Sequence, residues 1–143
     1  MKFHFGRILS VDLGLKKTGL AISDELWITI RILENLVPKS RSNDIDYLLR
    51  LCLKLEVKFI LIGYPLLPKS SHEGMMAKRA RGFYETLCLC LPGGLSAFLI
   101  DEAYTTFEAG ERLKLRKLHL GLLDGESAKI LIETFIYDQI NQI

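Results

Sequence analysis

Residues that form disulfides or bind zinc are scarce in this sequence of 143 residues, which has three cysteines and three histidines. Cys52, Cys88 and Cys90 cannot form a closed disulfide set, and their spacing is not the C-x-x-C of a zinc or redox site. The three histidines are isolated from one another along the chain. These features argue against a disulfide scaffold and a zinc centre. We expect the cysteines to be small buried hydrophobic residues in a reducing compartment.

The sequence also lacks a large net charge and a long apolar segment. It has 19 Lys and Arg against 17 Asp and Glu, a formal net charge of +2, which excludes a strongly basic packaging protein but not a local basic patch. The apolar stretch at residues 87–100 is shorter than the ~20 residues that span a bilayer. Arg7 and Asp12 interrupt the apolar stretch near the first residue, which argues against a signal peptide. We therefore expect a soluble, cytoplasmic protein with no membrane partner.

The composition is that of an ordinary globular domain. Hydrophobic residues make up 49% of the sequence and charged residues 25%. The mean hydropathy of +0.20 argues against a disordered chain. Domains typically contain about 100–200 residues, and no linker or repeat divides this sequence. We expect residues 1–143 to form one domain.

The first part of the sequence predicts three antiparallel strands. Residues 7–13 form a compact apolar run, and residues 14–17 (Gly-Leu-Lys-Lys) are typical of a hairpin turn. Residues 18–23 and 27–33 are rich in the apolar and β-branched residues that favour strands. Because the connections are short, we expect these strands to be antiparallel neighbours.

Helices and strands are then predicted to alternate. A helical pattern runs from Ile45 to Leu55, with Ser42 or Asn43 as its cap. A strand follows at residues 58–63, and residues 70–73 have the form of a capping box that begins the next helix. The remaining predictions are a strand at 95–100, a helix at 105–118 and a last helix from near Asp124. This order predicts an α/β fold in which strands four and five join a mixed sheet through right-handed crossovers.

Carboxylates end two of the predicted strands and begin the last predicted helix. Asp12 ends the first strand, Asp101-Glu102 end the fifth, and Asp124 opens the final helix. Taken singly, each could be an ordinary turn, strand-end or capping residue. The ends of crossover-linked strands gather at one edge of a sheet, so Asp12, Glu102 and Asp124 could meet there.

Three converging carboxylates would provide an oxygen-rich site for a hard divalent cation. Mg²⁺ or Mn²⁺ suits such a site, whereas zinc does not, because no His or Cys accompanies the carboxylates. Two such ions about 3.5–4 Å apart can hold a phosphodiester for in-line attack by water. The expected chemistry is therefore phosphodiester hydrolysis with two metal ions.

The residues after Asp12 also allow a different interpretation. Residues 12–19 have the form D-x-G-x-x-x-x-G, which resembles the first phosphate loop of actin-like ATPases and sugar kinases. Those ATPases need two such domains flanking the nucleotide, and this sequence offers neither the second half nor a second phosphate loop. We keep a small nucleotide-hydrolysing fragment as a minor alternative.

Four motifs in order make the sequence similar to the YqgF (RuvX) family. They lie at residues 11–24, 62–66, 100–106 and 124–128 and cover nearly the whole chain. The resemblance implies a ribonuclease H-like fold: a five-stranded sheet of three antiparallel strands followed by two parallel ones, flanked by helices. It also implies a metal-dependent nuclease with Asp12, Glu102 and Asp124 as catalytic and metal-binding residues. The family is described both as Holliday junction resolvases and as the nuclease that trims the 5′ end of pre-16S ribosomal RNA. We favour the ribosomal RNA precursor over branched DNA.

The sequence departs from the family pattern in three places. Ala103 stands where an Arg is usual, Leu122-Leu123 where a Lys is usual, and residues 67–70 lack the usual Asn and Asp-Gly turn. The missing groups would contact substrate phosphates or order the site. A nucleic-acid-binding module with a degenerate active site is therefore a second hypothesis.

Basic residues cluster in the sequence despite the near-neutral net charge. Lys and Arg are concentrated in residues 69–81 and 112–117, and Lys16-Lys17 follow Asp12 closely in the sequence. Such side chains bind phosphates without reading bases, although the same clusters could be solvated helix faces. The expected nucleic-acid-binding residues, which include two threonines of the third motif, are Lys16, Lys17, Lys78, Arg79, Arg81, Thr105 and Thr106.

Overall fold

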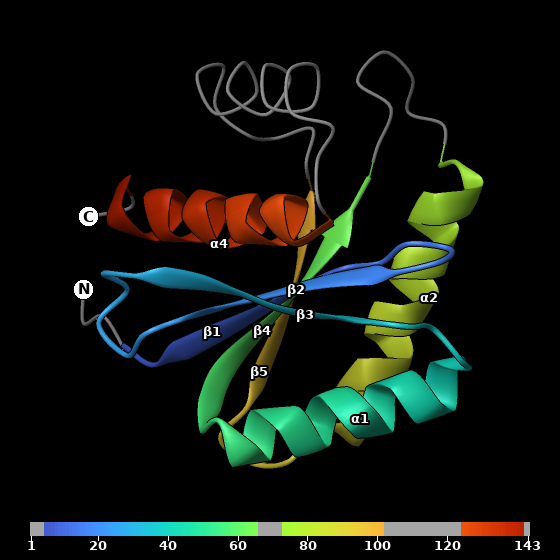
Figure 1. Ribbon diagram of the computed structural model, residues 1–143, viewed down its shortest axis with the longest axis horizontal. Helices are drawn as coiled ribbons and strands as arrows, with labels where there is room; N and C mark the ends of the chain where they lie inside the picture. Colours follow the sequence, from blue (N-terminus) through green and yellow to red (C-terminus); the bar gives the residue numbers. More distant parts are fainter. Residues whose placement is uncertain (1–4, 66–72, 102–123, 142–143) are drawn as a thin grey trace.

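The computed structural model describes residues 5–65, 73–101 and 124–141 of the chain. Within them lie five strands and three helices (Figure 1). The helix predicted at residues 105–118 falls outside the described residues.

The strands form a single mixed sheet in the order β3-β2-β1-β4-β5. β1 (Arg7–Asp12) pairs antiparallel with β2 (Thr18–Ser23), which pairs antiparallel with β3 (Ile30–Leu36). On its other side β1 pairs parallel with β4 (Val57–Tyr64), which pairs parallel with β5 (Ser96–Asp101). The predicted α/β fold with three antiparallel and two parallel strands is confirmed.

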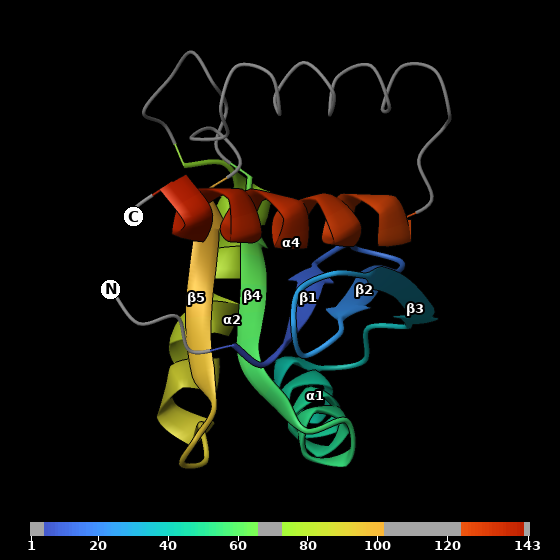
Figure 2. The same cartoon turned by 90° about the vertical axis from the view of Figure 1, so that its left-hand side faces the viewer.

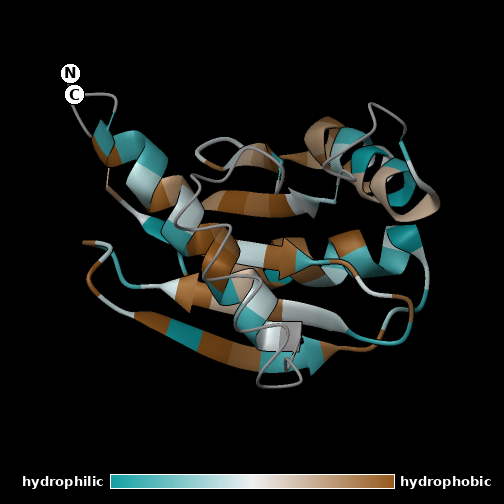
Figure 3. Cartoon of the chain, turned by 90° about the horizontal axis from the view of Figure 1, so that it is seen from above, coloured by the Kyte–Doolittle hydropathy of each residue, from teal (hydrophilic) through white to brown (hydrophobic). Residues whose placement is uncertain are grey.

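Helices cover both faces of the sheet (Figures 1 and 2). On one face lie α1 (Arg41–Lys54) and α2 (Met75–Cys90), and on the other α4 (Asp124–Asn141) crosses the strands. β1 shows why both faces are needed: Leu9 and Val11 pack among the α1 and α2 residues, whereas Ile8 packs against α4. The sequence of a strand that is buried on both faces is apolar at most positions. Figure 3 shows hydrophobic colour along the strands.

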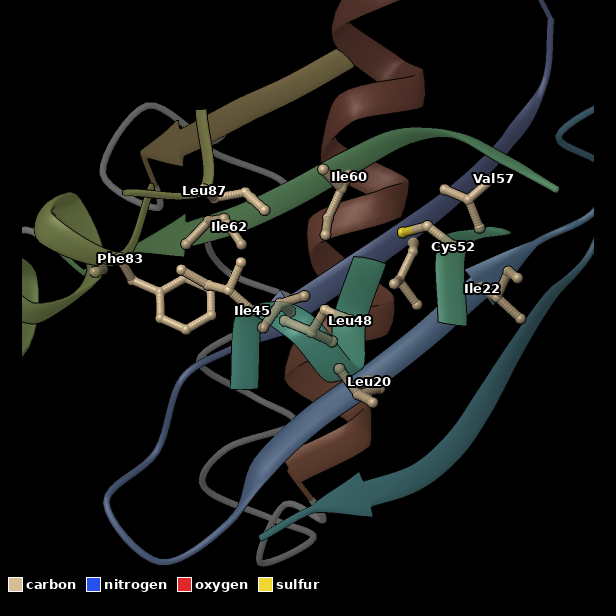
Figure 4. Packing of buried hydrophobic residues seen from close by; sticks show 13 residues of the cluster. Leu20, Ile22, Ile45, Leu48, Cys52, Val57, Ile60, Ile62, Phe83 and Leu87 are labelled. Atoms are coloured by element: carbon tan, nitrogen blue, oxygen red, sulfur yellow. The ribbon is translucent and has the colours of Figure 1, made fainter. Parts of the chain in front are cut away.

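The larger core lies between the sheet and the two helices α1 and α2. Figure 4 shows Ile45, Leu48 and Cys52 of α1 beside side chains of the strands, with Phe83 and Leu87 arriving from α2. Burial raises the pKa of the Cys52 thiol to about 12, so this residue is an inert core group. The expectation of buried cysteines holds for Cys52 but is wrong for Cys88 and Cys90, which are exposed near the end of α2.

The third strand begins three residues later than predicted. The Asp24 carboxylate accepts hydrogen bonds from the backbone N–H groups of Ile28 (2.6 Å) and Thr29 (2.7 Å). These bonds, with that of Thr29 foremost, lower the pKa of Asp24 and hold residues 24–29 as a loop. Trp27 has a φ of 61° within it. The loop therefore uses β-branched residues that the sequence assigned to the strand.

The predicted starts of α1 and α2 are also corrected. The N-cap of α1 is Ser40, whose hydroxyl accepts a hydrogen bond from the N–H of Asn43 (3.1 Å), and not Ser42 or Asn43. The N-cap of α2 is Gly74, so the capping box predicted at 70–73 does not begin that helix. In the described parts of the chain, no helix combines the length and apolar character needed to cross a bilayer.

Candidate functional site

β1, β4 and β5 run parallel to one another and end at the same edge of the sheet. In the register of β1 and β4, Val11 lies opposite Ile62, so Asp12 follows directly at the carboxyl end of β1. In the register of β4 and β5, Tyr64 lies opposite Asp101. The sheet thus brings Asp12 and the end of β5 to one edge, as the sequence predicted.

Asp12 belongs to the face of the sheet that α4 covers. Side chains alternate along a strand, so Ile8, Ser10 and Asp12 share one face. Ser10 is fully buried, and its hydroxyl donates to the carbonyl oxygen of Ala128 in α4 at 2.5 Å. Asp124 is the first residue of α4, four residues before Ala128. This bond joins the strand that ends in Asp12 to the helix that begins at Asp124.

Asp101 lies on the opposite face from Asp12. Its alternate neighbours Leu99 and Ala97 pack in the core under α1 and α2, whereas Ile100 packs with the α4 cluster. The prediction of a three-carboxylate site therefore depends on Glu102, which, like the side chain of Asp124, lies outside the described residues. Among the residues that are described, no group of three His, Cys, Asp or Glu could hold a metal ion. The convergence of Asp12, Glu102 and Asp124 stays a prediction.

The loop after Asp12 turns tightly because of Gly14. A Cβ atom at position 14 would lie 2.1 Å from the carbonyl oxygen of Lys17, so only glycine fits without moving the backbone. The Arg79 guanidinium of α2 donates from Nη1 to the Gly14 carbonyl oxygen at 2.7 Å. Lys16 and Lys17 are exposed in the same loop. Arg79, Lys16 and Lys17 therefore lie together at the end of β1.

Arg81 is engaged in an ion-pair network instead. Its Nε and Nη2 donate to the two carboxylate oxygens of Glu73 at 2.8 Å each, and Nη1 donates to Glu85 at 3.2 Å. The hydrogen bonds from Arg81, and then the one from Tyr64, lower the pKa of Glu73 to about 2. The bond to Glu73 raises the pKa of Tyr64, and the charge of Asp101 adds to this effect. The network connects the start of α2 to the end of β4.

The other predicted nucleic-acid contacts have simpler outcomes. Lys78 is exposed on α2, and Thr105 and Thr106 lie outside the described residues.

Sequence reasoning missed Ser10 and the pair of Tyr64 and Glu73. A serine inside an otherwise apolar strand was the available signal for Ser10. No sequence pattern indicates the hydrogen bond between Tyr64 and Glu73, and the capping-box interpretation gives Glu73 a different role.

Comparisons with known proteins agree with the motifs. The family model described as "RuvX: Holliday junction resolvase" matches residues 6–138. A protein of Anaeromyxobacter sp. (strain K) named "Putative pre-16S rRNA nuclease" is 33% identical over 134 residues, which is 91% of this chain and 96% of that protein. One of the same name from Syntrophus aciditrophicus (strain SB) is 32% identical over 140 residues, 95% and 91% of the two chains.

Solved structures give the same fold. The T. thermophilus RuvC structure in complex with a Holliday junction substrate superposes with a TM-score of 0.59 at 13% identity and covers 94% of this chain and 96% of that one. A second Thermus thermophilus RuvC structure gives a TM-score of 0.55 at 12% identity, with the same coverage of 94% and 96%. At such low identity, these similarities establish the arrangement of strands and helices and nothing further.

Proposed function

This chain belongs to the RuvX family of Holliday junction resolvases, and we propose that it is a divalent-metal-dependent nuclease that processes the 5′ end of pre-16S ribosomal RNA. The observation that carries the proposal is the identity of 33% to the protein named "Putative pre-16S rRNA nuclease", over nearly the full length of both chains. We propose residues 1–143 as a single nuclease domain, and the cytoplasm, where ribosomal RNA is made, as its location.

We assign the metal site to Asp12, Glu102 and Asp124. The donor set fits Mg²⁺ or Mn²⁺ because it is made of carboxylate oxygens with no sulfur or imidazole. Two observations support the assignment: Asp12 lies on the face covered by α4, and Ser10 bonds the same strand to the first turns of that helix. When bound, the ions would polarise the scissile phosphate and activate water. Asp12, Glu102 and Asp124 would hold the ions through their carboxylate oxygens, and Asp124 would hold the second ion or orient the attacking water.

We assign substrate binding to the cations at the end of β1 and on α2. Lys16, Lys17, Lys78 and Arg79 would contact phosphates, as would Thr105 and Thr106 in the third motif. Arg81 differs from them, because its donors already bind Glu73 and Glu85. We therefore give Arg81 the role of holding the start of α2 against Tyr64.

Asp12→Asn tests the proposed function directly. The substrate is a 5′-labelled RNA that carries the 16S 5′ end with its precursor extension, incubated with Mg²⁺, with Mn²⁺ or with EDTA. We expect trimming only with metal, and a fall of at least ~100-fold in rate for Asp12→Asn, because a lost metal ligand removes several kcal/mol of transition-state stabilisation. Circular dichroism checks that the variant is folded.

Asp46→Asn is the matched control, since Asp46 is exposed on α1, which covers the face of the sheet opposite to that of Asp12, and pairs with Arg50 at 3.0 Å. It makes the same chemical change and should cleave like wild type. Cleavage by Asp12→Asn at the wild-type rate would contradict the assignment of the site.

A Holliday junction is the second candidate substrate, favoured by the description of the family model. A four-way DNA junction in the same assay distinguishes it, because resolution into nicked duplexes with no trimming of the RNA would reassign the substrate. Salt-dependent RNA binding without cleavage in either metal would instead indicate a binding module. The uncharged residues Ala103, Leu122 and Leu123 are the sequence feature that motivates this alternative.

A further inference from the structure

Arg79 and Arg81, both in α2, differ in how many of their N–H groups are hydrogen-bonded. Arg81 commits three nitrogens to two carboxylates, Glu73 and Glu85. Within residues 5–65, 73–101 and 124–141, Arg79 makes one hydrogen bond, from Nη1 to the carbonyl oxygen of Gly14. In the described part of the chain, no Asp or Glu lies within ion-pair distance of Arg79. A guanidinium carries five N–H donors, so Arg79 keeps most of its donors and its full charge.

The bond from Arg79 reaches the loop that carries Asp12. Gly14 is two residues beyond Asp12, and the loop is so tight that a Cβ at position 14 would overlap the Lys17 carbonyl. Figure 1 shows the loop between β1 and β2 extending to α2. Arg79 is half-buried, and its bond joins two positions that are 65 residues apart in the sequence. This contact therefore restricts the movement of the end of β1.

We propose that Arg79 is a positioning residue that holds the loop after Asp12 through the Gly14 carbonyl and, with its remaining N–H groups, binds a backbone phosphate of the nucleic acid. The nature of the substrate rests on the proposed function, whereas the phosphate chemistry does not. A carbonyl is a neutral acceptor, so this bond does not offset the positive charge of Arg79, and no carboxylate among the described residues pairs with it. Charge-assisted bonds to phosphate are stronger than bonds between neutral groups, and the planar guanidinium can make two at once.

Arg79 and Arg81 would thus have separate roles in the same helix. Arg81 holds Glu73, Glu73 accepts the hydroxyl of Tyr64, and Tyr64 lies opposite Asp101 in the sheet. Arg81 therefore braces the end of β4, and three of its five N–H groups are bound to two carboxylates that offset its charge. Arg79 braces the end of β1, and its one bond in the described part of the chain is to a neutral carbonyl.

The salt dependence of binding separates a phosphate contact from a purely structural bond. The probes are a fluorescent RNA hairpin with a single-stranded 5′ extension and a fluorescent four-way DNA junction, followed by anisotropy in EDTA over 50–200 mM salt. Each phosphate contact contributes about 0.7–0.9 to the slope of log K against log salt. We expect Arg79→Ala to reduce the slope by about that amount, so that its affinity falls about 3-fold less than wild type over this range.

Two further variants make the result specific. Arg79→Lys keeps the charge and should restore the wild-type slope. Arg50→Ala removes the same charge from an exposed position on α1 that is paired with Asp46, and should leave the slope unchanged. Hydrogen exchange of the free protein tests the loop contact: the amides of residues 13–17 should exchange faster in Arg79→Ala and not in Arg50→Ala.

Each outcome decides the proposal apart from the nuclease assignment. An unchanged slope in Arg79→Ala overturns it even when the wild type cleaves RNA. Equal slope losses in Arg79→Ala and Arg50→Ala also overturn it, because they indicate a general charge effect. If neither probe binds with salt dependence, the phosphate contact is refuted. A reduced slope in a protein that cleaves nothing supports the Arg79 contact while the nuclease proposal fails, and the probe that shows the reduction identifies RNA or DNA as the source of the phosphate.

Discussion

Gly125, the residue after Asp124, has no room for a side chain. A Cβ atom at this position would lie 2.2 Å from Cγ2 of Ile32 on β3, whereas ordinary contact begins at 3.4 Å. Gly125→Ala must therefore push the start of α4 away from the sheet by about 1.2 Å or rotate the Ile32 side chain. Isoleucine is stiff at χ1, so the rotation is also costly.

The expected loss of stability follows from two opposing effects. Overpacking typically costs about 1–3 kcal/mol. The higher helix propensity of alanine returns at most ~1 kcal/mol, and less in the first turn of a helix. We expect Gly125→Ala to lower the free energy of unfolding by about 1–2 kcal/mol, measured by urea denaturation. Because Asp124 precedes Gly125, metal-dependent cleavage at low Mg²⁺ should fall as well.

A double-mutant cycle tests whether the contact with Ile32 is the cause. Ile32→Ala removes Cγ2, so the double variant should be more stable than the sum of the single effects by about 1 kcal/mol or more. Ile32→Val retains both γ carbons and should give no such rescue. Additive effects in the Ile32→Ala cycle, or equal rescue by Ile32→Val, would refute the packing argument.

Two further predictions concern the contacts that hold the site. Ser10→Ala should lower the free energy of unfolding by about 1 kcal/mol, because one buried hydrogen bond to Ala128 is lost. Ser10→Thr keeps a hydroxyl but adds a methyl group at a fully buried position, so it should not restore the stability. Urea denaturation measures both variants. Glu73 has a pKa of about 2 in the folded chain against an ordinary 4.5, so its contribution to stability is complete above pH 4.5 and disappears as the pH falls towards 2. The stability difference between wild type and Glu73→Gln should therefore shrink between pH 4.5 and pH 2, and a difference that stays constant would contradict the ion-pair role.

The order of the elements could be predicted because the apolar patterns are long and unambiguous. β1 is buried on both faces and appears in the sequence as an apolar run that Ser10 interrupts, while Ala128, Ile132 and Phe135 recur at helical spacing and pack on the sheet as expected. The boundaries were harder. Ser40, Ser42 and Asn43 are all good capping residues within four positions, and propensity alone cannot choose among them.

The site was only partly predictable for a different reason. Asp12 stood out because a carboxylate at the end of an apolar strand is unusual. The bonds from Arg79 to Gly14 and from Ser10 to Ala128 span 65 and 118 residues of sequence, and no local pattern encodes them. The ion pair of Glu73 and Arg81 could not be predicted, because the capping-box interpretation places Glu73 at the start of α2. The helix begins at Met75 instead, so Glu73 lies before it and binds Arg81 and Tyr64.

The departures from the family motifs mean that the remaining cations would have to neutralise more of the charge of a bound phosphodiester. The resemblance to the family motifs implies an arginine at the position of Ala103 and a lysine at that of Leu122-Leu123, so we expect fewer cations beside the predicted carboxylates of this chain. A bound phosphodiester still needs its charge neutralised. At the described end of β1, the groups that can do so are Arg79 and the two exposed lysines, Lys16 and Lys17. Of these, Arg79 is the one already fixed against the loop, so it can bind a phosphate with a smaller loss of side-chain entropy than a flexible lysine.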